Sequence, residues 1–327
     1  MAVMSKPKAT RAWWSLLLLV AMGAPVLAAQ QAPPWSQGKN NPAPEKGYIF
    51  QVEDVDNVPD LHGNPNGAQL VLFIGGNQFM VLPELIGGFE KLHPELRGRI
   101  FYETLPPGIL RRQMEHDGIL TLGNLTLQVH ADVYEAGARA LAEMEQQGQV
   151  ELPVHYASNQ LEIMVHAGNP RGVRSLQDLG RDDLRLSMPN PAWEGVARQI
   201  EDSLRKAGGE PLARKVMDAK VKSGTTYLTH IHHRQTPMRI MSGKSDAGVT
   251  WSSEVRFQEK IGNPISGVAI PAKENTTAVY AAAVLRNAPH AAAARAWVGY
   301  LGSEEAQAAY RKFRFGPATA GSRGKGR

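Results

Sequence analysis

The sequence predicts an α/β protein with a parallel β-sheet, and three observations lead to this prediction. The 327 residues have an ordinary globular composition, 43% hydrophobic and 20% charged, and suffice for two domains. Residues 68–74 form a continuous apolar run, which is typical of a strand buried on both faces of a parallel sheet. Apolar residues at helical spacing follow over residues 79–92, and this alternation then repeats along the chain.

The first part of the chain predicts three strand–helix pairs. These are strand 68–74 with helix 79–92, strand 100–102 with helix 109–116, and strand 129–133 with helix 136–147. Pro83 lies inside the first helical pattern, so that helix is expected to start late or to kink.

A second α/β set begins near Val154. Its predicted strands are 161–165, 184–188, 247–251, 265–270 and 278–285. Asn190 and Pro191 are good N-cap and first-turn residues for a helix that would run to Gly208. Two alanine-rich helices, 288–302 and 303–313, are expected to close the fold.

The N-terminus reads as a cleavable secretory signal over residues 1–29. Three basic residues precede an apolar stretch of 13 residues, 12–24, which is too short to span a bilayer comfortably, and Val26-Leu-Ala-Ala29 offers small residues for cleavage. An uncleaved N-terminal anchor is the alternative. Residues 30–67 read as a flexible leader rich in Pro, Asn and Gln, and residues 317–327 as a disordered basic tail. The sequence therefore predicts a periplasmic protein.

Charge and cysteine content exclude several classes of function. The formal net charge of +5 falls to +2 without the predicted signal, and three further basic residues lie in the tail, so no nucleic-acid partner is expected. The absence of cysteine excludes disulfides, thiolate metal sites, a cysteine nucleophile and a lipid anchor on an N-terminal cysteine. No nucleophile elbow, phosphate-binding loop or nucleotide fingerprint is present, so neither enzymatic activity nor a cofactor is expected.

Seven short motifs, in order, give the chain a resemblance to a known family. They are Leu70-Val-Leu-Phe-Ile-Gly-Gly-Asn77, Gly108-Ile-Leu-Arg-Arg-Gln-Met-Glu115, Ala131-Asp-Val-Tyr134, Tyr156-Ala-Ser-Asn-Gln-Leu161, Pro189 to Gly195, Asp246-Ala-Gly-Val-Thr-Trp251 and Tyr300-Leu-Gly-Ser-Glu-Glu-Ala306. Over about residues 68–316 the chain resembles the periplasmic substrate-binding proteins of ABC transporters, of the molybdate- or oxyanion-binding type.

The resemblance implies a type II periplasmic-binding fold with two α/β lobes, two crossover hinge strands and a ligand cleft between the lobes. Lobe 1 would comprise residues 68–154 and 271–316, and lobe 2 residues 155–270. It implies a monomer that captures a small anion for an inner-membrane ABC permease or a sensor. The anion would be an oxyanion or a small organic anion, free or complexed with a metal.

Three helix starts are expected to offer backbone N–H groups to the ligand. They contribute Gly76 and Asn77, then Gly108, then Trp193, Glu194 and Gly195 as candidate ligand-binding residues. The glycine turn would also allow the strand and the helix to approach closely. If Trp193 does not contact the ligand, it is expected to pack in the core. Molybdate binders have serines at the first two starts, where this chain has Asn77 and Pro106-Pro-Gly108. Glu194 would repel an oxyanion and favour a cation or a protonated group, unless it only balances the helix dipole.

The segment from His230 to Pro237 holds three histidines and an arginine. His233 and Arg234 are candidate ligand contacts, and Trp251 would stack on the ligand or pack in the core. His232 and His233 are also candidate metal ligands, because imidazole suits zinc, copper and nickel. A periplasmic metal-binding accessory or sensor protein that uses the same cleft is therefore the alternative function. Surface or hinge histidines bonded to the backbone remain the simpler interpretation.

Overall fold

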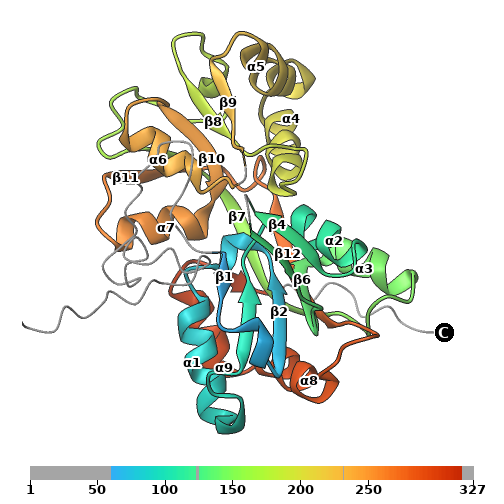
Figure 1. Ribbon diagram of the computed structural model, residues 1–327. Helices are drawn as coiled ribbons and strands as arrows, with labels where there is room; N and C mark the ends of the chain where they lie inside the picture. Colours follow the sequence, from blue (N-terminus) through green and yellow to red (C-terminus); the bar gives the residue numbers. More distant parts are fainter. Residues whose placement is uncertain (1–59, 123–124, 231, 319–327) are drawn as a thin grey trace, which may run out of the picture. The chain divides into compact units, whose positions relative to one another are not determined.

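The computed structural model describes residues 60–122, 125–230 and 232–318 (Figure 1). The predicted signal segment, most of the leader and most of the basic tail lie outside these residues. Within the described ranges, none of the helices combines the length and the apolar character that crossing a membrane requires.

The first lobe is built on one end of a mixed sheet in the order β1-β3-β2-β6-β12-β7. Strand β2 pairs in parallel with both β3 and β6, as the strand–helix alternation predicts, and β12 is antiparallel to its neighbours. The elements of this lobe are β1 (Leu61–His62), β2 (Leu70–Ile74), α1 (Leu82–Leu92), β3 (Ile100–Glu103), α2 (Pro107–Glu115), β4 (Ile119–Leu122), β5 (Leu125–Gln128), β6 (Val133–Gly137), α3 (Ala138–Gln146), β12 (Thr277–Val284), α8 (Ala291–Tyr300) and α9 (Glu304–Arg311).

Strand β2 is apolar throughout because both of its faces are covered. Leu70, Leu72 and Ile74 pack in the core cluster that contains residues of α1, α8 and α9. Val71 and Phe73 point to the opposite face and pack with residues of α2 and α3. Helices on both faces of the sheet explain why this strand shows a continuous apolar run rather than an alternation.

The second lobe continues the same sheet in the order β7-β10-β8-β9, with β8 parallel to both neighbours. Its elements are β8 (Leu186–Met188), α4 (Val196–Arg214), a π-helical turn (Lys215–Ala219), α5 (Lys220–Lys222), β9 (Thr226–Leu228), α6 (Gln235–Met241), β10 (Ala247–Trp251), α7 (Ser252–Lys260) and β11 (Ile265–Ala269).

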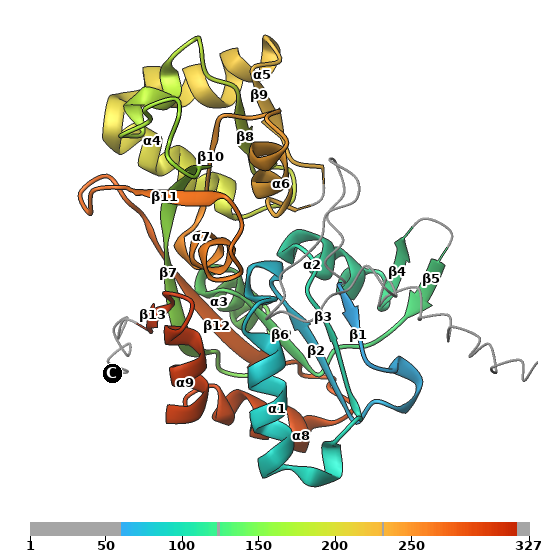
Figure 2. The same cartoon turned by 90° about the vertical axis from the view of Figure 1, so that its left-hand side faces the viewer.

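Strand β7 (Val154–His166) passes from one lobe to the other (Figures 1 and 2). Residues 154–160 pair with β12, and residues 161–166 pair with β10 and β11. The return connection, residues 270–276, runs beside it because the side-chain amide of Asn275 bonds both the N–H (3.1 Å) and the carbonyl oxygen (2.8 Å) of Leu161. Two connections between the halves of the sheet give the two-lobed fold that the resemblance implied.

Two local predictions need correction. The strand predicted over 129–133 is β6 (Val133–Gly137), because residues 125–128 are taken up by a β4–β5 hairpin that the sequence did not predict. The helix expected after Asn190 begins only at Val196. Asn190 caps a tight turn instead, since its Oδ1 accepts from the N–H of Ala192 (3.0 Å) and its carbonyl oxygen accepts from the N–H of Glu194 (3.0 Å).

The last residues of the predicted leader belong to the fold. Strand β1 pairs antiparallel with β3, with Leu61 opposite Glu103 and His62 opposite Tyr102. Asp60 precedes β1, and its carbonyl oxygen accepts from the N–H of Thr104 (2.9 Å). This pairing positions the Asp60 carboxylate for the contacts described below.

Asp132 ties the sheet to the start of α8, and its loss is expected to destabilise the first lobe. The buried carboxylate accepts from the N–H of Val71 (2.8 Å) and from the N–H of His290 (2.7 Å). Asp132→Ala leaves both donors without their acceptor, so we expect a loss of about 3 kcal/mol in urea unfolding. Asp182→Ala removes only an exposed ion pair with Lys215 and should change little. Equal effects of the two variants would contradict the prediction.

Candidate functional site

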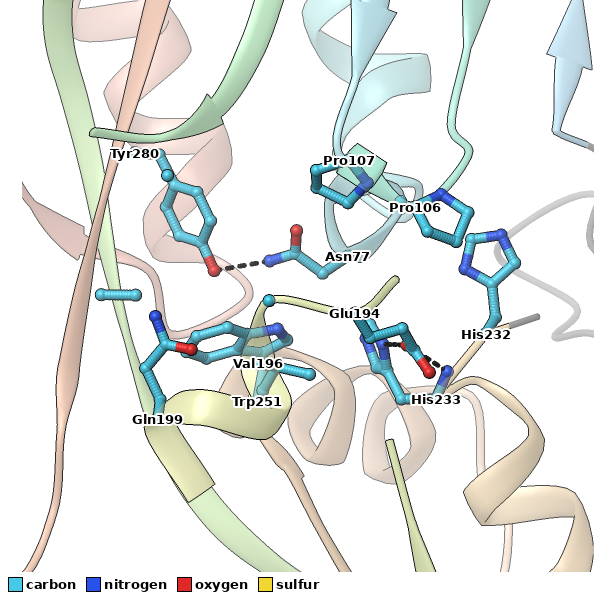
Figure 3. Close-up of a pocket in the computed structure, with 14 residues that line it drawn as sticks. Asn77, Pro106, Pro107, Glu194, Val196, Gln199, His232, His233, Trp251 and Tyr280 are labelled. Carbon is cyan, nitrogen blue, oxygen red and sulfur yellow. Dashed lines mark hydrogen bonds and ion pairs between the residues drawn. The ribbon is translucent and has the colours of Figure 1, made fainter. Parts of the chain in front are cut away.

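A cavity of about 80 Å³ lies where the two lobes meet (Figure 3). This volume holds on the order of six water-sized spheres, so it suits a small ligand. The first lobe lines it with Gly76, Asn77, Pro106, Pro107, Gly137, Ala278 and Tyr280, and the second with Glu194, Gly195, Val196, Gln199, His232, His233 and Trp251.

Asn77 and two aromatic rings form one side of the cavity. The turn Gly76–Gln78, directly after β2, places Asn77 so that its Nδ2 donates to the hydroxyl of Tyr280 (2.6 Å). Tyr280 lies on β12, and Trp251 at the end of β10 meets its ring edge to face, with ring centroids 6.0 Å apart. This wall therefore combines a turn after one strand (β2), a residue within a second (β12) and the last residue of a third (β10).

Backbone N–H groups at two of the three expected helix starts remain available to a ligand. Within the described chain, the N–H groups of Asn77, Gly195 and Val196 have no hydrogen-bond acceptor. Gly195 and Val196 form the N-terminus of α4, where the helix dipole favours negative charge. The start of α2 contributes less, since Pro106 and Pro107 have no N–H.

Three ionisable side chains form a buried cluster beneath the second-lobe wall. Nδ1 of His233 contacts Oε2 of Glu194, and its Nε2 lies 2.6 Å from Oε1 of Glu254. The Glu194 carboxylate also accepts from the backbone N–H of His233 (2.7 Å) and from the hydroxyl of Thr229 (2.5 Å). Both oxygens of Glu194 are thus occupied by its own lobe.

Electrostatics keep the central histidine of this cluster protonated. Burial by itself would lower the pKa of His233, but the carboxylates of Glu254 and Glu194 overcome that effect and raise it to about 10. Burial would likewise raise the pKa of Glu194, yet the charge of His233 holds it below its ordinary value. The imidazolium offsets one of the two carboxylate charges that flank it, so the cluster as a whole retains a single negative charge.

A second ionic group links the lobes. Oδ1 of Asp60 lies 2.5 Å from Nη2 of Arg234 and 3.2 Å from Nε2 of His232. Burial would raise the pKa of Asp60, but the charge of Arg234 keeps it well below its ordinary range. Because Asp60 precedes β1 of the first lobe and Arg234 precedes α6 of the second, this ion pair crosses between the lobes.

The structure brings seven of the candidate residues together and places three elsewhere. Gly76, Asn77, Glu194, Gly195, His232, His233 and Trp251 line the cavity. Gly108 and Trp193 instead line a wider adjoining groove of about 500 Å³. Arg234 is buried outside the cavity, with its guanidinium 5.1 Å from the ring centroid of Phe79.

Sequence reasoning missed Tyr280, Gln199 and Glu254. The tyrosine in the strand predicted over 278–285 was a usable signal for Tyr280. Gln199 lies four residues after Gly195, hence one helical turn along α4, and was open to the same reasoning. Glu254 had no signal, because an acidic residue in the first turn of a helix is ordinary.

The geometry of His233 opposes its expected role in holding a metal. Each ring nitrogen faces a carboxylate oxygen, so a metal could bind only after one of these contacts broke. Over the residues that the structure describes, no three His, Asp or Glu side chains are grouped as a metal site would need.

These features define a two-lobed binding protein of the type II periplasmic-binding fold, with its cavity at the junction of the lobes. Residues 70–315 match the family model described as bacterial extracellular solute-binding protein, and the chain belongs to that family. The resemblance to periplasmic substrate-binding proteins is confirmed.

Named relatives support the same fold. The molybdate-binding protein ModA of Mycobacterium tuberculosis is 27% identical over 154 residues, which is 46% of this chain and 51% of that protein. The chain thus spans about half the length of the curated relatives it matches. The sulfate-binding protein SubI of M. tuberculosis aligns with a TM-score of 0.61 at 19% identity, over 76% of this chain and 86% of SubI. The Azotobacter vinelandii periplasmic molybdate-binding protein aligns with a TM-score of 0.59 at 16% identity, over 75% of this chain and 98% of that protein.

Proposed function

We propose that this protein captures a small anion in the cavity between its lobes and delivers it, in the periplasm, to an inner-membrane ABC importer. The anion is an oxyanion or a small carboxylate. The observation that carries the proposal is a set of backbone N–H groups, at Asn77, Gly195 and Val196, that come from both lobes and have no acceptor in the part of the chain that the structure describes. The protein binds and releases its ligand without chemical change.

The charge of the cavity wall supports an anion held by hydrogen bonds rather than by ion pairs. Arg234 is matched by Asp60, and His233 is enclosed by two carboxylates, so neither side chain offers its charge to a ligand. Backbone N–H groups and a helix N-terminus can bind an anion without a cationic side chain. The names of the relatives, molybdate- and sulfate-binding proteins, agree with an anionic ligand.

The alternative, a metal-binding accessory or sensor protein, rests on His232 and His233. It requires His233 to leave Glu194 or Glu254, which would leave a buried carboxylate unpaired. The geometry therefore favours the anion.

The first test is a thermal-shift and calorimetric screen of the mature chain after its ligand has been removed by unfolding and refolding. The panel holds sulfate, molybdate, phosphate, small carboxylates, Zn²⁺ and Ni²⁺. An anion at about 100 times its dissociation constant should add about 2.7 kcal/mol of stability.

Two variants at Gly195 separate the role of its N–H group from that of its size. The φ angle of Gly195 is −59°, which proline can adopt, and no atom lies within 4 Å of an added Cβ. Gly195→Pro removes the N–H and should weaken anion binding about tenfold or more, whereas Gly195→Ala should retain it. A response to metals alone, abolished by His232→Ala, would instead establish the alternative function.

A further inference from the structure

Two acceptor atoms in the cavity wall lack a donor. Nδ1 of His232 and Oε1 of Gln199 are both buried, and neither has a hydrogen-bond partner among the described residues. Both side chains line the cavity, and His232 is only 1% exposed (Figure 3). Since buried polar groups in proteins are nearly always paired, these atoms point to a partner supplied by the ligand.

The contact with Asp60 decides which nitrogen of His232 carries the proton. Nε2 lies 3.2 Å from the Asp60 carboxylate, which can only accept a hydrogen bond. The contact does not have the geometry of a hydrogen bond, and neither ring nitrogen of His232 has a hydrogen-bond partner among the described residues. A neutral imidazole that places its proton on Nε2 still turns its N–H dipole toward the Asp60 charge, and Nδ1 then keeps its lone pair.

The position of Nδ1 brings it to the ligand. An ideal Cβ built on Gly76 would lie 3.1 Å from this nitrogen, so the ring edge rests against the turn that carries Asn77. Gln199 lies on α4 in the same lobe as His232, one turn after the N–H groups of Gly195 and Val196. The cavity thus combines N–H donors with two acceptors.

We propose that the cavity selects anions that also carry a hydrogen-bond donor. The anionic oxygens bind the backbone N–H groups, and an O–H or N–H of the ligand donates to His232 Nδ1 or Gln199 Oε1. The ligand class is then the monohydrogen oxyanions, such as hydrogen phosphate, and the small hydroxycarboxylates. Sulfate, molybdate and plain carboxylates are rejected because they leave both buried acceptors unpaired.

This inference rests on the proposed function and is tested with pairs of anions matched in charge and shape. At pH 7.5 phosphate is mostly a dianion with one O–H, whereas sulfate is a dianion without one, and glycolate and acetate form the corresponding monoanionic pair. Calorimetry on the mature chain, after its ligand has been removed, measures the affinity for each anion. The affinity for phosphate should exceed that for sulfate, or the affinity for glycolate should exceed that for acetate, by about tenfold or more.

Gln199→Met removes an acceptor at nearly constant volume and should reduce that preference severalfold, mainly by weakening the donor-bearing anion. Gln146→Met on the exposed face of α3 is the matched control and should leave both affinities unchanged. His232→Phe should reduce the preference further, and its melting temperature reports whether it folds. If His232→Phe does not fold, Gln199→Met still tests the inference by itself.

The outcomes are distinguishable. The inference is overturned if phosphate binds no more tightly than sulfate and glycolate no more tightly than acetate. It is also overturned if the preference for the donor-bearing anion is unchanged in Gln199→Met. Either result leaves the proposal of an anion-binding protein intact. Binding of no anion at all removes the proposed function as well.

Discussion

Replacing His233 with glutamine is expected to cost about 3–5 kcal/mol of the free energy of unfolding. The imidazolium lies between the carboxylates of Glu194 and Glu254, and all three residues are buried. Glutamine removes the positive charge and leaves two buried negative charges facing each other. Urea unfolding of the mature chain at pH 7 measures the loss.

The second carboxylate provides the control for this variant. Adding Glu254→Gln to His233→Gln removes one of the two uncompensated charges, so the double variant should be more stable than the single one. A single variant that loses less than about 1 kcal/mol, or a double variant that is less stable still, would show that the cluster is not ionised.

The pH dependence of the same pair of proteins tests the protonation state. Because the pKa of His233 is raised from 6.5 to about 10 in the folded chain, its stabilisation is complete below pH 6.5 and is lost as the pH rises toward 10. The difference in unfolding free energy between wild type and His233→Gln should therefore shrink by roughly 1.4 kcal/mol for each pH unit in this window. A constant difference from pH 7 to 9.5 would contradict the assignment.

Gly76→Ala is expected to abolish ligand binding and to cost about 1–3 kcal/mol of stability. A Cβ at Gly76 would collide with the carbonyl oxygen of Thr104 and would lie 2.6 Å from Cε1 of His232. Thr104 belongs to the first lobe and His232 to the second, so the methyl group must either displace the turn that carries Asn77 or push the lobes apart. Calorimetry with the anion found in the screen should show at least a tenfold loss of affinity.

Gly87→Ala supplies the matched control. Gly87 lies in α1, and no atom lies within 4 Å of its added Cβ. Alanine in a helix is favoured over glycine, so this variant should gain about 0.5–1 kcal/mol and bind as wild type does. If Gly76→Ala bound the ligand with unchanged affinity, His232 and the Asn77 turn would not form the binding wall.

Local sequence determined the elements that pack the core. The apolar run of β2, the apolar spacing of α1 and the glycine turn between them are properties of neighbouring residues, and each appears in the structure close to its predicted place. The two misplaced elements, the strand predicted over 129–133 and the helix expected after Asn190, are also local failures. Asn190-Pro191 suits a turn as well as a helix start, and in the structure the Asn190 side chain caps a turn that ends before α4 begins at Val196.

Tertiary structure alone decided the state of the charges at the site. Glu194 and His233 are 39 residues apart, Asp60 and Arg234 are 174 apart, and Asn77 and Tyr280 are 203 apart. From the sequence, Glu194 was expected to repel an anion and Arg234 to bind one. Folding gave each a buried partner of opposite charge, because a buried charge is tolerated only when it is paired, and the partner can come from any part of the chain.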